Sequence, residues 1–227
     1  MRQPDMEFNL AQTIAIYALP VIFAITLHEA AHGYVARHFG DKTAFMLGRI
    51  SLNPMRHIDW VGTIAVPLLI LVASKLFGGP AVLFGWAKPV PVNFHALRRP
   101  KRDMLWVAAA GPAANLVMAL CWAVLAKAAL VLPQGMYSLP LGLMAEAGIT
   151  VNIVLMVLNL LPILPLDGGR IAVSLLPDRL ALGYARLEPF GFPILLMLVF
   201  LPPHVLGTIM MPMVRASIGV IETLFRL

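Results

Sequence analysis

Three residues that could do chemistry lie in the heptapeptide "LHEAAHG" at 27–33: His28, Glu29 and His32. On a helix, residues i and i+4 lie on one face a turn apart, so both imidazoles can reach a single point. Glu29 follows His28 directly and can reach a water molecule bound there. The pattern H-E-x-x-H on a helix is typical of two zinc ligands and a general base. The spacing therefore predicts a hydrolytic metal site.

The surroundings of this motif favour the same interpretation. No Asp, Glu, Lys or Arg occurs from Phe8 to Leu27, so the motif lies at the end of an apolar stretch. A charged residue at the centre of a membrane span costs roughly 2.5–3.5 kcal/mol on insertion scales, and such residues usually mark functional sites. The alternatives are a proton relay, packing histidines or a Glu–Lys pair, but no Lys or Arg lies close to Glu29 in the sequence.

A catalytic zinc ion usually has three protein ligands and an open position for water. The candidates for the third ligand are His38, His57, His95, His204, Glu146 and Asp167. Asp167 follows an apolar run in "NLLPILPLDGG", where prolines and glycines break the helix on the same side of the membrane as the histidines. We therefore expect Asp167 to be the third ligand, with His57 in reserve. Capping a turn is the alternative role of Asp167.

The composition predicts the fold class. Of 227 residues, 60% are hydrophobic and 12% are charged, which is about half the charged fraction of a soluble domain. Apolar runs long enough to span a bilayer, which takes about 20 residues, predict an all-α polytopic membrane protein. We expect about five transmembrane helices, at about 9–37, 104–131, 141–163, 184–201 and 204–225. Together they form one domain over 1–227, with a catalytic core at about 9–171 and C-terminal helices at about 184–225.

The distribution of basic residues predicts the topology. Lys and Arg cluster at 37–56, 98–102 and 170–186, and the positive-inside tendency places all three clusters in the cytoplasm. The segment 60–96 must then leave the cytoplasmic face and return, as a re-entrant or extended hairpin. Pro89 and Pro91 forbid a regular helix in it, and irregular backbone at membrane depth lines a cavity. Arg215 leaves open whether 204–225 spans the membrane or lies at its interface.

The remaining features exclude several classes of protein. The net charge of +6 comes without a basic stripe interleaved with aromatic residues, which argues against nucleic-acid binding. Cys121 is the single cysteine, so an internal disulfide is excluded. The first span carries no cleavage signal, and we expect it to be retained. No polar stretch is long enough for an appended soluble domain.

The sequence resembles the site-2 proteases, which are intramembrane zinc metalloproteases. The resemblance lies in "HEAAH", "LGRISLNPMRHID", "FGWAKPVPVN", "AGPAANL" and "NLLPILPLDGG", and covers about residues 20–171. It implies that His28, His32 and Asp167 bind one Zn²⁺ per chain and that Glu29 activates the water. It also implies that the hairpin at 78–96 edges the substrate cleft. The PDZ-type domain and regulatory tail of some relatives are not expected in this short form.

Further residues have two interpretations each. Asn115 and Asn159 could act on the substrate or its oxyanion, as could His57, or the amides could bond between helices that Gly111 lets approach. An extended edge at 82–92 could pair with an unwound substrate helix. Trp86 and Lys88, with Pro89 and Pro91, would then line the cleft edge. Trp86 and Lys88 could instead anchor the chain at the membrane interface.

The predicted function is zinc-dependent hydrolysis of peptide bonds within or near transmembrane helices of other membrane proteins, as in regulated intramembrane proteolysis. The expected partners are a substrate helix and the lipid bilayer, in a bacterial inner membrane with the site toward the cytoplasm. The main alternative is a proton- or metal-coupled transporter, which would predict inverted repeats that the sequence does not show. An inactive relative and a zinc protease for lipid-modified peptides are further alternatives. The oligomeric state is left open.

Overall fold

The computed structural model describes residues 9–66, 69, 72, 87–133, 135, 137–200 and 205–227. Every regular element in these ranges is helical, which confirms the predicted all-α class. The long helices are α1 (Leu10–His38), α4 (Pro100–Val131), α5 (Ser138–Leu160) and α9 (Val205–Phe225). The shorter elements are α2 (Thr43–Met46), η1 (Pro54–Arg56), η2 (Trp60–Ala65), η3 (Phe94–Ala96), α6 (Asp167–Leu175), α7 (Asp178–Ala185) and α8 (Glu188–Phe200).

Four helices of the described chain, α1, α4, α5 and α9, are long and apolar enough to cross a membrane. The chain is therefore an integral membrane protein. In the region of the fifth expected span, 184–201, the described chain has the last two residues of α7 and then α8. With 13 residues, α8 is about 20 Å long, which is less than the ~30 Å of the hydrocarbon layer. The uncertain segment at 204–225 forms one of the four candidate spans.

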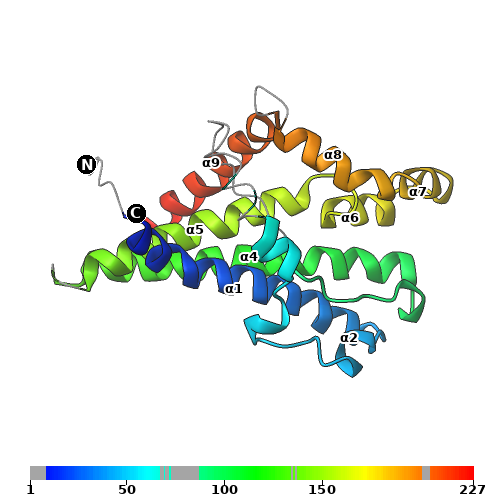
Figure 1. Cartoon of the computed structure of the whole chain (residues 1–227), viewed down its shortest axis with the longest axis horizontal. Coiled ribbons are helices and arrows are strands. Elements are labelled where there is room, and N and C mark those ends of the chain that lie inside the picture. Colours follow the sequence, from blue (N-terminus) through cyan, green and yellow to red (C-terminus); the bar gives the residue numbers. More distant parts are fainter. Residues whose placement is uncertain are drawn as a thin grey trace.

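Helices α1, α4 and α5 pack against one another and form the centre of the molecule (Figure 1). Small residues allow the close approach, among them Ala24, Ala119 and Ala145, none of which is exposed. Gly148 lies directly against the indole of Trp122, where an added Cβ would be 2.6 Å from Cε2. Helix α9 covers one side of α5 and of the end of α4.

Two contacts with α4 bring the distant parts of the site together. An apolar cluster packs the end of α1 against the start of α4; it consists of Ala36, Leu97, Met104 and Val107. After α5 the chain reverses, and α6 packs against α4 as well (Figure 1). The last third of α1 and the first turn of α6 therefore meet beside α4.

The hairpin predicted at 60–96 is described only in part. It begins with the π-helix η2, but residues 73–86 lie outside the described residues, and the predicted cleft-edge residue Trp86 is among them. Whether 60–77 spans or re-enters the membrane is likewise outside what is described. Residues 87–93 have no regular secondary structure, as Pro89 and Pro91 predict.

Candidate metal centre

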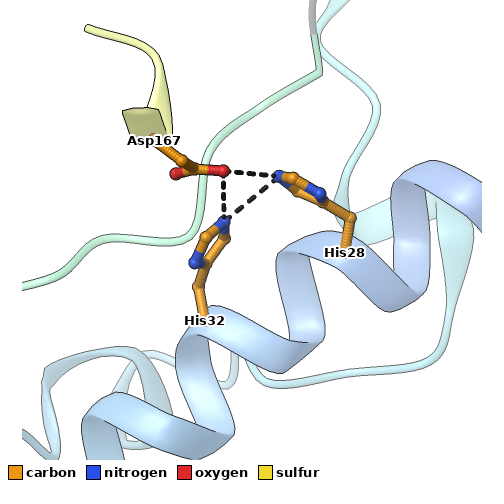
Figure 2. Close-up of side chains that lie close together, drawn as sticks. All are labelled: His28, His32 and Asp167. Atoms are coloured by element: carbon orange, nitrogen blue, oxygen red, sulfur yellow. Dashed lines mark hydrogen bonds and ion pairs between the residues drawn. The ribbon is translucent and has the colours of Figure 1, made fainter. Parts of the chain in front are cut away.

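His28, His32 and Asp167 converge on one point (Figure 2). The Nε2 atoms of the two histidines are 3.1 Å apart. They lie 3.3 and 3.4 Å from Oδ2 of Asp167, and all three side chains are nearly buried, with 10–12% of their surface exposed. Among the described residues, these three form the one group of His, Cys, Asp and Glu that could hold a metal ion. Helices α1 and α6 thus place the three residues together as expected.

Hydrogen bonds at the far side of each imidazole fix its tautomer. His28 Nδ1 lies 2.7 Å from Oδ1 of Asn115, and the Asn115 NH₂ group donates to Ala24 O and to Asn152 Oδ1. Because the amide nitrogen has acceptors of its own, its oxygen must accept the proton on His28 Nδ1. His32 Nδ1 lies 2.7 Å from the carbonyl oxygen of Val107, which can only accept. In the neutral imidazoles, both Nε2 atoms therefore point a lone pair toward Asp167.

This arrangement fits a divalent zinc ion. Two nitrogen lone pairs and a carboxylate oxygen face one another with no donor between them, and the buried Oδ2 of Asp167 has no hydrogen-bond partner among the described residues. Burial raises the pKa of the Asp167 carboxyl, but His28 and His32 lower that pKa to about 2 when they carry protons on Nε2, the positions that a metal ion would take. Asp167 is therefore ionised at neutral pH. Two imidazoles and one carboxylate are a ligand set of catalytic zinc.

Gly111 of α4 keeps the centre of this group free. A Cβ added there would lie 2.6 Å from His28 Nε2 and closer still to His32 Nε2. The motif "AGPAANL" therefore provides a glycine at the point where α4 passes the histidines and, one turn later, Asn115 to orient His28. The sequence interpretation of Gly111 included only the close approach of helices.

The position of Asp167 depends on a tight reversal after α5. Helix α5 ends at Leu160 and α6 begins at Asp167. A Cβ on Gly168 would overlap the carbonyl oxygens of Leu160 and Leu161, and one on Gly169 would lie 2.5 Å from the backbone nitrogen of Leu164. The two glycines that follow Asp167 are needed because only hydrogen atoms fit between the start of α6 and the preceding loop.

Glu29 lies beside the metal group and is partly buried. Its Oε2 accepts a 2.7 Å hydrogen bond from the backbone N–H of Val90, in the extended segment 87–93. The side chains of Lys88 and Pro89 in this segment are exposed, and that of Pro91 is half-buried. The segment thus contacts the candidate base.

The other predicted residues lie outside the metal group. His57 is buried, its Nε2 lies 2.7 Å from the carbonyl oxygen of Ser51, and it is not part of the group formed by His28, His32 and Asp167. Asn159 donates from Nδ2 to Leu155 O, 3.0 Å away in its own helix. Asn115 takes the interhelical role, through its bond to His28.

Sequence reasoning missed three residues that support the site. Asn152 is fully buried, and its Oδ1 accepts a hydrogen bond from the Asn115 amide. The sequence signal that could have found it is a polar amide within an apolar span. Asp41 is also buried and binds the backbone of Asn93, 52 residues away. Arg49 donates to the carbonyl oxygens of Lys88 and Pro89. The last two look like ordinary loop charges in the sequence.

Comparison with known proteins gives the family. The chain is 38% identical over 213 residues to the Bacillus subtilis (strain 168) protein named "Putative zinc metalloprotease YwhC", a match that covers 91% of this chain and 89% of that protein. The chain belongs to this zinc metalloprotease family. It is also 29% identical over 183 residues to "Putative zinc metalloprotease Rip2" of Mycolicibacterium smegmatis, covering 80% of this chain and 65% of that protein. No protein-family model matches the chain, and no solved structure matches it significantly.

Proposed function

We propose that this membrane metalloprotease is an intramembrane zinc endopeptidase of the site-2 type, which cleaves peptide bonds within or near transmembrane helices of other membrane proteins. The observation that carries the proposal is the convergence of two Nε2 lone pairs and the Asp167 carboxylate next to Glu29, at the end of a candidate span. Ionisable groups in such a position are expensive unless they have a function.

The residues have separate roles in this reaction. His28, His32 and Asp167 would hold one zinc ion, which supplies Lewis acidity to the attacking water and to the scissile carbonyl. Glu29 accepts a proton from the water as its oxygen bonds to the carbonyl carbon. Glu29 then delivers that proton to the amine nitrogen as the carbon–nitrogen bond breaks. Val90 donates to Oε2, and we assign the proton transfer to Oε1.

The proposed substrate class follows from the place of the site. A protease within the bilayer meets other helices, and their peptide bonds become accessible only after local unwinding. An unwound segment could pair with the hairpin, but Pro89 and Pro91 have no N–H, and the N–H groups of Lys88 and Val90 are already bonded. The described part of this edge, residues 87–92, therefore offers few N–H groups to a substrate strand.

The proposed location is a bacterial inner membrane, with the site toward the cytoplasm. The basic clusters at 37–56, 98–102 and 170–186 border the ends of α1, α4 and α5 that carry or adjoin the site. The positive-inside tendency supports the cytoplasmic side for these ends.

Metal analysis and substrate mapping together test the proposal. The wild-type protein and Glu29→Gln, purified in detergent without chelators, are analysed for zinc and incubated with solubilised bacterial membranes. New peptide N-termini are then mapped by mass spectrometry. We expect about one zinc per chain in both proteins, and new termini within transmembrane segments for the wild type alone. Termini confined to lipid-modified peptides would indicate the other protease class, and zinc without any cleavage would favour a transporter.

A further inference from the structure

We infer that the extended segment 87–93 is part of the catalytic apparatus: its Val90 amide orients Glu29, and Gly33, Asp41 and Arg49 are positioning residues that hold the segment in place. This inference rests on the proposed role of Glu29 as the base. It concerns residues that touch neither the metal group nor the reacting atoms.

The contact between Glu29 and Val90 is suited to orienting a carboxylate. Val90 is 6% exposed, and its N–H donates to Glu29 Oε2 at 2.7 Å. Hydrogen bonds to an ionised acceptor are about twice as strong as neutral ones. Pro89 and Pro91 flank Val90, so it offers the only N–H of the tripeptide, and their fixed φ angles limit the directions in which it can point.

Both ends of the segment are tied to the region that follows α1. At one end, the buried carboxylate of Asp41 accepts the N–H of Asn93 at 2.6 Å and that of Thr43 at 2.9 Å. At the other end, Arg49 Nη2 donates to the carbonyl oxygens of Lys88 and Pro89, at 3.1 and 3.3 Å. The N–H of Lys88 donates to His57 O at 2.9 Å. The segment is thus fixed on either side of Val90.

Gly33 sets the distance between the segment and α1. It lies one turn after Glu29, and a Cβ added there would be 2.8 Å from Ile50 Cγ1 and 3.2 Å from Val90 Cγ1. Both values are below ordinary van der Waals contact, so an alanine would require Ile50 to shift and would press on Val90, which donates to Glu29. The glycine that ends "LHEAAHG" therefore allows Val90 to reach the base.

This geometry predicts an effect on the rate of the chemical step. A displaced segment leaves zinc bound through His28, His32 and Asp167, since none of them contacts it through a hydrogen bond. Glu29, however, loses the bond that selects its orientation. A misplacement of about 1 Å at a catalytic group can cost about 100-fold in rate.

The test compares Gly33→Ala and Arg49→Gln with the wild type. Gly219→Ala is the matched control, because an added Cβ meets nothing within 4 Å at that helix position. The substrate is a tagged single-span reporter built from the fastest-cleaved segment of the mapping experiment above. The readouts are zinc content, thermal unfolding, kcat and KM. We expect kcat to fall about 10- to 100-fold in both variants, with zinc content and KM unchanged, and Arg49→Lys to recover part of the loss.

Each other outcome overturns a defined part of the argument. Wild-type kcat in folded, zinc-loaded Gly33→Ala and Arg49→Gln would refute the positioning role, and raised KM at unchanged kcat would assign the segment to substrate binding instead. If Gly33→Ala does not fold, Arg49→Gln alone decides. Cleavage by Glu29→Gln at the wild-type rate would refute the proposed function itself, whatever the other variants do.

Discussion

The Nδ1–H of His28 donates to Oδ1 of Asn115 at 2.7 Å, although the two residues are 87 positions apart and lie on different helices. Asn152 on a third helix accepts from the other end of the same amide, at 3.0 Å. Helices α1, α4 and α5 are thus linked through one fully buried side chain. The chain of bonds fixes the tautomer of His28 and the direction of its free lone pair.

Removal of this bond should weaken metal binding without abolishing it. In Asn115→Ala, His28 loses the acceptor that orients it, and partners of this kind are worth about 10- to 100-fold in metal affinity. Zinc affinity is measured by competition with a coloured chelator. Asn159→Ala is the control, because among the described residues that amide donates to Leu155 O in its own helix. Equal affinities in the two variants would show that His28 is held by packing alone.

Gly111→Ala should abolish zinc binding. The added methyl group would occupy the space between the two Nε2 atoms, 2.6 Å from that of His28. Gly142→Ala is the control, because its nearest neighbour, Ala129 Cβ, is 3.8 Å away. Metal content of both purified variants provides the measurement. Full zinc occupancy in folded Gly111→Ala would contradict the proposed location of the ion.

Asp167→Asn should lose most of its zinc, whereas His57→Ala should retain it. The amide keeps the shape of the carboxylate but lacks its charge, and His57 lies outside the metal group. Zinc per chain, measured by mass spectrometry after dialysis, separates the two. Retention in Asp167→Asn together with loss in His57→Ala would restore His57 as the third ligand.

Gly148→Ala should destabilise the helix bundle. Its Cβ would overlap the indole of Trp122, which is 7% exposed and has little room to move. Overpacking of this kind costs about 1–3 kcal/mol. Thermal unfolding in detergent should show a lower midpoint than Gly142→Ala in the same helix, where the added Cβ makes an ordinary van der Waals contact with Ala129 at 3.8 Å. An unchanged midpoint would mean that α4 and α5 adjust without cost.

Local patterns in the sequence determined the helical class and half of the site. The i, i+4 spacing of His28 and His32 places both on one helix face whatever the rest of the chain does. Apolar runs of sufficient length predicted the spans that contain α1, α4, α5 and α9. The proline and glycine residues around Asp167 predicted a break in the helix at the same depth as the histidines. These are short-range properties, and sequence alone can show them.

Packing between distant segments decided the rest. The contact of Glu29 with Val90 crosses 61 positions, and the pairing of Asn115 with His28 crosses 87. No local pattern predicts such pairs, because their distances depend on how closely α4 and the segment 87–93 approach α1. The start of α8 at Glu188 was also not predicted, since hydropathy records apolar length but not where a helix begins. Only the tertiary structure shows that Gly33 leaves room for Ile50 and Val90, and that Gly111 leaves room for His28 and His32.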